Sequence, residues 1–438
     1  MTSSELIQYQ VEPGGTLTGE IVVPGDKSIS HRSIMFGALA NGTTKVSGFL
    51  EGEDSLATLK AFQDMGVVIT GPDNGWVTIN GVGMFGLKAP TKNLDLGNSG
   101  TSMRLMSGLL SAQKFETTLV GDKSLSGRPM KRVIDPLNSM GAKISSNDGK
   151  APLVLHGNTQ LNAIHYDMPM ASAQVKSCVL LAGMFAEGNT CVTEPGVTRD
   201  HTERMLETFQ YPIQKNKNKV CIEGGHTLKA CDIEVPADIS SAAFFLVGAS
   251  IAKDSNLVLK NVGLNPTRDG VIEILRLMGA DITLENERLF GAEPVADIRV
   301  KSSKLTGIKI PSHLVPLAID EFPVLFIAAA CAEGETVLTD ASELRVKESD
   351  RIQVMADGLS ILGIENRVTD DGIIIQGGTI GGGEVESHDD HRISMSFAIA
   401  GLRATDTILI NNCANVATSF PGFVSKSRDV GLNITEAN

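Results

Sequence analysis

Residues 94–104 read Leu94-Asp95-Leu96-Gly97-Asn98-Ser99-Gly100-Thr101-Ser102-Met103-Arg104, and the organisation of the whole chain can be worked out from them. A short apolar strand runs into a polar turn bracketed by glycines, and the turn opens a helix that we expect to begin near Met103. The first N–H groups of a helix have no partner within it, and they lie at the positive end of the helix dipole. Such a turn therefore favours a bound anion. A single copy is equally typical of an ordinary strand-to-helix connection with Asn98 or Ser99 as N-cap.

A related pattern recurs along the chain. The motif Leu-x-x-Met-Gly-x-x-Ile, complete or degenerate, has its Gly position at residues 66, 141, 210, 279, 363 and 431. Each copy follows a polar cluster that opens a helix rich in small residues, a strand, and a second polar cluster that opens a second helix. Further strands come after the motif. The pattern predicts an α/β protein built from six repeats of about 70 residues.

Length and composition narrow the function. A chain of 438 residues is too long for one hydrophobic core, so we expect two domains. The formal charge of −13 repels polyanions, and one Trp and three Tyr leave few surfaces on which bases could stack. We therefore expect no nucleic-acid partner. If the ligand is a small anion, a local basic cleft must attract it.

Cysteine spacing and hydropathy indicate a cytoplasmic protein. The six cysteines form no Cys-x-x-Cys pair and no His/Cys metal-ligand spacing, so we expect buried reduced thiols and no metal site. The longest apolar runs, 242–252 and 322–332, are shorter than a membrane span. The first ten residues lack the pattern of a signal peptide.

Charged side chains gather at the predicted helix openings. The candidates for holding anions are Lys27, Arg32, Arg128, Arg199, Lys347, Arg351 and Arg392, with Ser28, Ser172 and Gln174 for hydroxyl or carboxylate oxygens. An arginine at a helix start opposes the dipole, which a bound anion would explain, although we treat Arg268 as a solvated side chain. Asp320 and Glu348 lie among these cations, and a carboxylate pair can divide acid and base chemistry. The sequence Gly81-Val-Gly83-Met-Phe-Gly86 is no dinucleotide motif, because no helix is predicted to follow it.

Several of these motifs occur together in one known family. They are Pro24-Gly25-Asp26-Lys27-Ser28-Ile29-Ser30-His31-Arg32, the 97–104 turn, Gly127-Arg128-Pro129-Met130, Ser172-Ala173-Gln174-Val175-Lys176-Ser177, Arg345-Val346-Lys347-Glu348-Ser349-Asp350-Arg351 and Asp390-His391-Arg392. Over essentially its whole length the chain resembles the 5-enolpyruvylshikimate-3-phosphate (EPSP) synthases of the shikimate pathway. The sequences of its motifs resemble those of the branch often called class II.

The resemblance implies a fold and a reaction. The fold is the two-domain enolpyruvyl transferase fold, an inside-out α/β barrel of six βαβαββ repeats, three per domain. One domain would comprise residues 1–22 plus 239–438 and the other residues 23–238, with the active site in the cleft between them. The implied reaction transfers the enolpyruvyl group of phosphoenolpyruvate to the 5-hydroxyl of shikimate-3-phosphate and releases phosphate. It needs no cofactor, and we expect a monomer.

The resemblance also implies a role for each candidate residue. Phosphoenolpyruvate would be held by Lys27, Gly100, Arg128, Gln174, Arg351 and Arg392. Shikimate-3-phosphate would be held by Ser28, Arg32, Ser172, Gln174, Arg199, Asp320 and Lys347. Asp320 would take the 5-hydroxyl proton and Glu348 would protonate the methylene carbon, with Lys27 stabilising charge between the substrates. Glyphosate, an anionic mimic of phosphoenolpyruvate, would bind beside Gly100.

One position departs from the family, and two alternative functions stay open. Many members carry a Lys where this chain has Thr418, so one expected contact to phosphoenolpyruvate is absent or rerouted. The first alternative is the sister enzyme that uses UDP-N-acetylglucosamine, whose loop cysteine has no counterpart at 126–130 here. The second is a catalytically inactive phosphosugar-binding protein, against which the pair of carboxylates argues.

Overall fold

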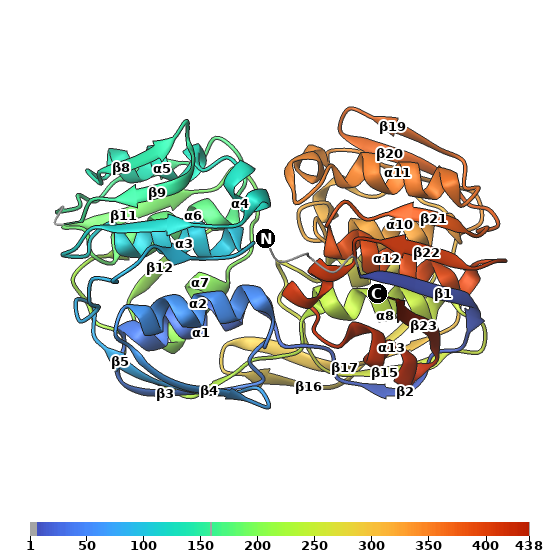
Figure 1. Ribbon diagram of the computed structural model, residues 1–438, viewed down its shortest axis with the longest axis horizontal. Helices are drawn as coiled ribbons and strands as arrows, with labels where there is room; N and C mark the ends of the chain where they lie inside the picture. The colour runs from blue at the N-terminus through green and yellow to red at the C-terminus, as the bar shows by residue number, and fades with distance from the viewer. Residues whose placement is uncertain (1–6, 158–159, 438) are drawn as a thin grey trace. The chain divides into compact units, whose positions relative to one another are not determined.

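The computed structural model describes residues 7–157 and 160–437, which form two compact units. Unit 2 comprises Gly25–Val235 and Phe290–Glu293, and unit 1 comprises the described residues before Gly25, Pro236–Leu289 and those from Pro294 onward. Each unit has its own hydrophobic core. Figure 1 shows the course of the chain within each unit.

Six β-sheets, three in each unit, correspond to the six predicted repeats. The sheets of unit 2 have the strand orders β14-β3-β5-β4 (Ile233–Glu234, Asn41–Ser47, Trp76–Val82, Val68–Asp73), β6-β7-β9-β8 (Leu94–Asp95, Thr117–Val120, Lys150–Leu155, Ile144–Asn147) and β10-β11-β13-β12 (His165–Asp167, Asn189–Thr193, Lys219–Glu223, Ile213–Asn216). Those of unit 1 are β16-β17-β15-β2 (Asp281–Phe290, Glu293–Lys301, Asn256–Gly263, Thr18–Ile21), β18-β20-β19 (Glu335–Leu338, Gly372–Gln376, Asn366–Thr369) and β21-β22-β1-β23 (Gly383–Glu386, Ile408–Asn411, Gln8–Gly15, Leu432–Ala437).

The sheet that contains the 94–104 stretch shows the plan of a repeat. Strand β6 lies parallel to β7, with Leu94 opposite Leu119, and β7 is antiparallel to β9, which is antiparallel to β8. Parallel neighbours need a crossover, and helix α3 supplies it. The β10 sheet repeats this order with α6 as its crossover. The prediction of an α/β fold with six βαβαββ repeats is confirmed.

The helices of unit 2 are α1 (Lys27–Leu39), α2 (Glu53–Asp64), α3 (Gly100–Leu110), α4 (Lys123–Gly127), α5 (Lys131–Ser139), α6 (Ala173–Gly183) and α7 (His201–Thr208). Those of unit 1 are α8 (Ile239–Ile251), α9 (Gly270–Leu277), α10 (Phe322–Ala330), α11 (Arg351–Ile361), α12 (His391–Ala400) and α13 (Phe423–Val430), with 3-10 turns at Ser312–Leu314, Ser342–Val346, Gly401–Arg403 and Ala414–Thr418.

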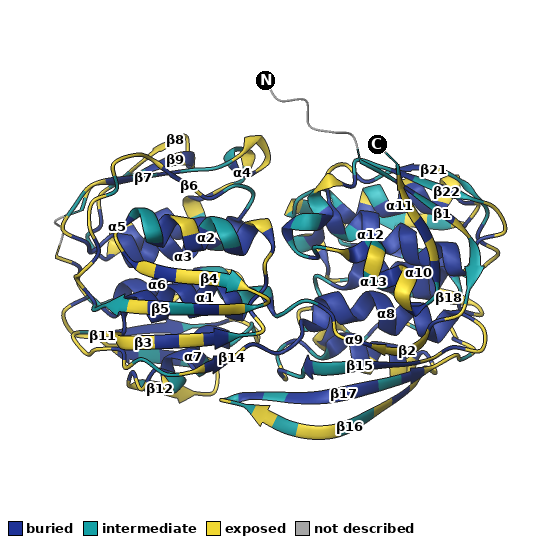
Figure 2. Ribbon diagram, turned by 60° about the horizontal axis from the view of Figure 1, so that its bottom comes forward, coloured by how far each residue is buried: buried dark blue, intermediate teal, exposed yellow. Residues whose placement is uncertain are grey.

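The first helix of each repeat is the buried one. Every residue of α8 and α10 is buried, and these two helices pack against each other and against α12. In unit 2, α3 packs against α6 in the same way. Figure 2 shows these helices in the buried colour, with exposed residues on the strands outside them. Helices this apolar on all sides have no stable place except a core, which fixes where their N-termini lie.

A strand that pairs with a distant part of its own unit lies just before each of the points near residues 24 and 235 where the chain passes to the other unit. Strand β2 lies parallel to β15, and β14 lies parallel to β3, so each pairs with a strand far away in sequence. The last sheet is completed from the start of the chain, because β1 lies between β22 and β23, antiparallel to both. Residues near both ends therefore share one sheet.

Three details differ from the sequence-based expectations. Helix α3 begins at Gly100 rather than near Met103, because Ser99 caps it by accepting a bond from the N–H of Ser102. Arg128 is the C-cap of α4 rather than the start of a helix. Cys191 and Cys221 lie opposite each other on β11 and β13 and form a disulfide, so the expectation of reduced thiols holds for the other four cysteines only.

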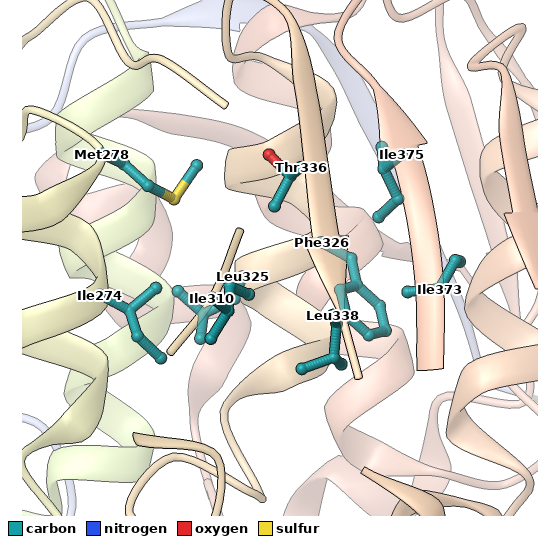
Figure 3. Close-up of a pocket in the computed structure, with 9 residues that line it drawn as sticks. All are labelled: Ile274, Met278, Ile310, Leu325, Phe326, Thr336, Leu338, Ile373 and Ile375. Atoms are coloured by element: carbon teal, nitrogen blue, oxygen red, sulfur yellow. The ribbon is translucent and has the colours of Figure 1, made fainter. Parts of the chain in front are cut away.

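The core of unit 1 encloses a small apolar cavity of about 10 Å³, lined by Ile274, Met278, Ile310, Leu325, Phe326, Thr336, Leu338, Ile373 and Ile375 (Figure 3). This space is too small and too apolar to hold a ligand. Over residues 7–157 and 160–437, no helix is both long and apolar enough to cross a membrane.

Candidate functional site

The N-terminus of α1 places a lysine and a buried arginine in unit 2. Asp26 caps the helix by accepting from the N–H of Ile29 at 2.8 Å. Lys27 follows, and its Nζ lies 2.9 Å from Oδ2 of Asp54. One turn later, Arg32 donates to Oγ1 of Thr202 at 2.7 Å and to the carbonyl of Ser28 at 2.9 Å. Burial, with the nearby Arg199 adding to it, lowers the pKa of the Arg32 guanidinium to about 10 although carboxylates oppose the shift.

The N-terminus of α3 is surrounded by two arginines. A Cβ atom at Gly100 would lie 3.1 Å from Nη1 of Arg104 and 3.2 Å from Nη1 of Arg128. Arg128 donates to the side chain of Asn98 at 2.7 Å and to its carbonyl at 3.3 Å. Because glycine has no side chain, both guanidinium groups can approach the first turn of the helix.

Helix α6 contributes a polar N-terminus of the same kind. Ser172 caps it by accepting from the N–H of Val175 at 3.4 Å. Gln174 accepts a hydrogen bond from Arg104 and donates to Oγ1 of Thr101 at 3.0 Å. Gln174 is thereby connected to α3. Arg104, which is not among the predicted site residues, links α3 to α6 through its hydrogen bond to Gln174. Only the folded structure reveals this contact.

A buried histidine joins three of these elements. Nδ1 of His31 lies 2.8 Å from Oγ1 of Thr58 on α2 and 3.3 Å from Oγ of Ser102 on α3. Ser102 is in turn 2.7 Å from Oγ of the capping residue Ser99. Burial first, and then Lys27 and Arg32, hold the pKa of His31 well below its usual value. A neutral His31 can serve as a partner for hydroxyl groups without adding charge to the site.

We call five basic residues of unit 2 the cationic site: Lys27 and Arg32 on α1, Arg104 on α3, Arg128 beside the first turn of α3, and Arg199, which lies close enough to Arg32 to affect its pKa. Helix N-termini and guanidinium groups both favour anions, and Arg in particular binds carboxylate and phosphate oxygens in pairs. An arrangement that brings three helix N-termini and five cations into one unit fits ligands with several negative charges.

The predicted carboxylates lie in unit 1 around one arginine. Arg351 begins α11, and only 1% of its side chain is exposed. Its Nη1 lies 3.2 Å from Oδ1 of Asp320, and its Nη2 lies 2.7 Å from Oε2 of Glu348. Nζ of Lys347 is 3.3 Å from the same oxygen of Asp320. We call these residues the Arg351 cluster, which comprises Asp320, Lys347, Glu348, Arg351 and Asp390.

Asp390, to which the sequence motif assigns no role, holds Arg351 in place. Its Oδ2 lies 2.8 Å from Nε of Arg351, and its Oδ1 caps α12 by accepting from the N–H of Arg392 at 3.0 Å. Burial opposes the charge on both partners. Arg351 nevertheless lowers the pKa of Asp390, and the carboxylates Asp390, Glu348 and Asp320 raise the pKa of Arg351 above its usual value.

Arg392, a predicted site residue, and Thr418, the position that departs from the family, both belong to unit 1. Nη1 of Arg392 is 3.9 Å from Oε1 of Glu321, the N-cap residue of α10. Thr418 is buried and donates to the carbonyl of Asn415 at 2.7 Å, so it does not replace the lysine that many family members have there.

Arg268 is buried in unit 1, which makes the expectation of a solvated side chain wrong. Its Nη2 lies 3.0 Å from Oδ1 of Asp238 and 2.5 Å from Oγ of Ser240. Both partners stand at the start of α8. The charge of Arg268 is therefore engaged inside the fold.

Each unit thus gathers the predicted residues that belong to it. Unit 2 holds Lys27, Ser28, Arg32, Gly100, Arg128, Ser172, Gln174 and Arg199, and unit 1 holds Asp320, Lys347, Glu348, Arg351 and Arg392. In the part of the chain that the structure describes, no group of three or more His, Cys, Asp or Glu side chains could hold a metal ion.

Comparison with known proteins agrees with the repeats and the motifs. The family model described as EPSP synthase (3-phosphoshikimate 1-carboxyvinyltransferase) matches residues 11–426. A 3-phosphoshikimate 1-carboxyvinyltransferase of Hydrogenovibrio crunogenus is 62% identical over 99% of both chains, and one from Legionella pneumophila is 58% identical over 98% of this chain and 100% of the relative. A solved EPSP synthase structure from Acinetobacter baumannii is 60% identical, covers 99% of this chain and 100% of its own, and has a TM-score of 0.90. The chain belongs to the EPSP synthase family.

Proposed function

We propose that this chain catalyses the reaction of its family, transfer of the enolpyruvyl group of phosphoenolpyruvate to the 5-hydroxyl of shikimate-3-phosphate. Phosphate is released, and the product leads towards chorismate and the aromatic amino acids. The observation that carries the proposal is the Arg351 cluster, in which Asp320 and Glu348 are both bonded to one buried arginine. A protein that only bound anions would gain nothing from two carboxylates at this place.

We assign phosphoenolpyruvate to residues of both units. Its charges would be bound by Lys27, Gly100, Arg128, Gln174, Arg351 and Arg392. The approach of Arg104 and Arg128 to Gly100 supports this assignment, because a carboxylate or phosphate there would meet two guanidinium groups and the N-terminus of α3. Arg351 would exchange part of its bonding to Glu348 for bonding to the substrate.

Shikimate-3-phosphate is assigned to Ser28, Arg32, Ser172, Gln174, Arg199, Asp320 and Lys347. Arg32 and Arg199 lie close enough for Arg199 to contribute to the lowered pKa of Arg32, and a phosphate between them would relieve that repulsion. We take the two units as the two domains that the resemblance implies.

The chemistry divides between the two carboxylates. Asp320 takes the proton of the 5-hydroxyl while the hydroxyl oxygen bonds to C2 of phosphoenolpyruvate, and Glu348 gives a proton to the methylene carbon. The tetrahedral intermediate then loses phosphate from C2 while the Glu348 carboxylate takes a proton back from the methyl carbon, which restores the double bond. Asp320 passes its proton to the departing phosphate, so both carboxylates return to their starting state. Lys27, Arg128 and Arg351 stabilise the charge that develops on the phosphate and carboxylate groups.

Phosphate release tests the proposal. The purified chain is incubated with phosphoenolpyruvate and shikimate-3-phosphate. In parallel reactions UDP-N-acetylglucosamine replaces shikimate-3-phosphate, or each substrate is present alone. We expect phosphate only when shikimate-3-phosphate is present together with phosphoenolpyruvate. Release with the nucleotide sugar would assign the chain to the sister activity, and binding of both substrates without release would make it an inactive binding protein.

We further propose that the protein is a monomer that works in the cytoplasm without a cofactor.

A further inference from the structure

Helix α6 contains a buried lysine to which no contact with substrate is assigned. Only 1% of the Lys176 side chain is exposed. Its Nζ lies 2.6 Å from Oε1 of Glu203 and 3.1 Å from Oε1 of Glu194. Lysine and glutamate are seldom buried this fully, and burial raises the pKa of Glu203 even though Lys176 opposes the shift. We call these three residues the Lys176 cluster.

The two glutamates stand at the two ends of one loop. Glu194 follows the last residue of β11, and Glu203 lies in the first turn of α7. The loop between them contains Arg199. Lys176 therefore ties both ends of the Arg199 loop to α6, the helix whose N-terminus carries Ser172 and Gln174.

A second set of bonds fixes the loop from within. Thr198, the neighbour of Arg199, donates its hydroxyl to Oε2 of Glu194. The backbone of Glu194 exchanges two bonds with Asn218: its N–H donates to the Asn218 carbonyl at 2.8 Å, and its own carbonyl accepts from Nδ2 at 2.9 Å. Glu194 is thus fixed in place, and its side chain holds Thr198, the residue beside Arg199.

The residues next to the Lys176 cluster bind Arg32. Ser177 accepts from Nη2 of Arg32 at 3.0 Å, Thr202 accepts from Nε at 2.7 Å, and the Thr202 hydroxyl donates to Ser177 at 2.7 Å. The ion pair of Lys176 with Glu203 and the bond of Ser177 with Thr202 join α6 to α7 at adjacent positions. One network therefore lies behind both Arg32 and Arg199.

We propose that the Lys176 cluster and Thr198 are positioning residues that set Arg32 and Arg199 for the phosphate of shikimate-3-phosphate. This rests on the proposed function of those two arginines. Stability alone does not account for the cluster, because a buried ion pair is often no more stabilising than apolar side chains of the same volume. Two guanidinium groups that share one phosphate need closely defined positions, and fixed bonds to their supporting loop supply them.

The proposal predicts an effect on one substrate only. Thr198→Val removes the hydroxyl that binds Glu194 and keeps the volume of the side chain. We expect the KM for shikimate-3-phosphate to rise roughly three- to tenfold, the loss of one hydrogen bond, with kcat at saturation and the KM for phosphoenolpyruvate unchanged. Thr198→Ser keeps the hydroxyl and should restore the wild-type KM. Thr208→Val is the matched control, because its hydroxyl bonds only to the Arg204 carbonyl within α7 among the contacts described.

A second variant tests Lys176 itself. Lys176→Met alone would leave two carboxylates buried without their cation, so it is combined with Glu203→Gln, which keeps the cluster at one net negative charge. The double variant should raise the KM for shikimate-3-phosphate further than Thr198→Val. If it does not fold, the Thr198 variants decide the question.

Three results would overturn the inference: an unchanged KM in Thr198→Val, an equal rise in the KM of both substrates, or no rescue by Thr198→Ser. Each of these presupposes an active wild type. A wild type that releases no phosphate from the two substrates would instead refute the proposed function.

Discussion

Replacing Gly100 with Ala should separate inhibitor from substrate at the first turn of α3. The new methyl carbon would lie 3.1 Å from Nη1 of Arg104 and 3.2 Å from Nη1 of Arg128, whereas ordinary contact begins at 3.4 Å. Both guanidinium groups must therefore move by a few tenths of an ångström, which changes the positions from which they would bind an anion at this turn. Gly100 has a helical backbone, so the substitution adds crowding without backbone strain.

The magnitude follows from this overlap. Overpacking by one methyl group costs about 1–3 kcal/mol, which corresponds to a roughly ten- to hundredfold change in a binding constant. Glyphosate is longer than phosphoenolpyruvate, so we expect its inhibition constant to rise by that factor and the KM for phosphoenolpyruvate to rise by less. The wild type is expected to be inhibited.

The assay is competitive inhibition by glyphosate against phosphoenolpyruvate at saturating shikimate-3-phosphate. Gly127→Ala is the control, since a Cβ there meets nothing within 4 Å and Gly127 has no assigned contact to substrate. Equal inhibition constants for wild type and Gly100→Ala, or a wild type that is already insensitive, would show that Gly100 does not determine the shape of this site.

Three further predictions concern charges in the two units. Lys27→Met should lower kcat by about a hundred- to a thousandfold, the effect of losing one preorganised electrostatic group. Lys60→Met, which removes an exposed lysine paired with Asp64, should have no effect, and near-normal turnover of Lys27→Met would contradict its role. Asp320→Asn and Glu348→Gln should each reduce kcat far more than substrate affinity measured by calorimetry, and loss of binding alone would make them structural partners of Arg351. His31 stays neutral in the folded chain, whereas in the unfolded chain it gains a proton below about pH 6.5, so its contribution to stability is lost as the pH falls. Between pH 7 and pH 5 the free energy of unfolding of the wild type, measured by urea titration, should therefore drop by roughly 2 kcal/mol more than that of His31→Gln. Parallel curves of unfolding free energy against pH for the two proteins would refute this.

The sequence predicted the repeats because their signals are local. A capping residue such as Ser99, a small-residue helix and a Met-Gly turn all act within about ten residues of one another, and these signals placed the helix N-termini correctly to within a few residues. The assignment of Arg351 beside Asp320 and Glu348 came from the resemblance to the family. The structure confirms only that these three side chains are in contact.

What the sequence did not predict depends on burial and on distant partners. Lys176 and Arg268 are typical surface residues by type, and only the fold shows that each is buried beside a carboxylate. The disulfide was missed for the same reason, since Cys191 and Cys221 come together only through the pairing of β11 with β13. Local patterns give no register between strands that are far apart in sequence.

The place of β1 has a consequence for how the chain can fold as it is made. Residues 25–235 carry every strand of the three sheets of unit 2, so this unit can fold while the rest is still being synthesised. Strand β1 leaves the ribosome first, but its neighbours β22 and β23 are among the last segments to emerge. The earliest part of the chain must therefore wait for the latest, and a truncated product would expose the edges of β1 to other chains. Unit 1 can be completed only after β23 has emerged.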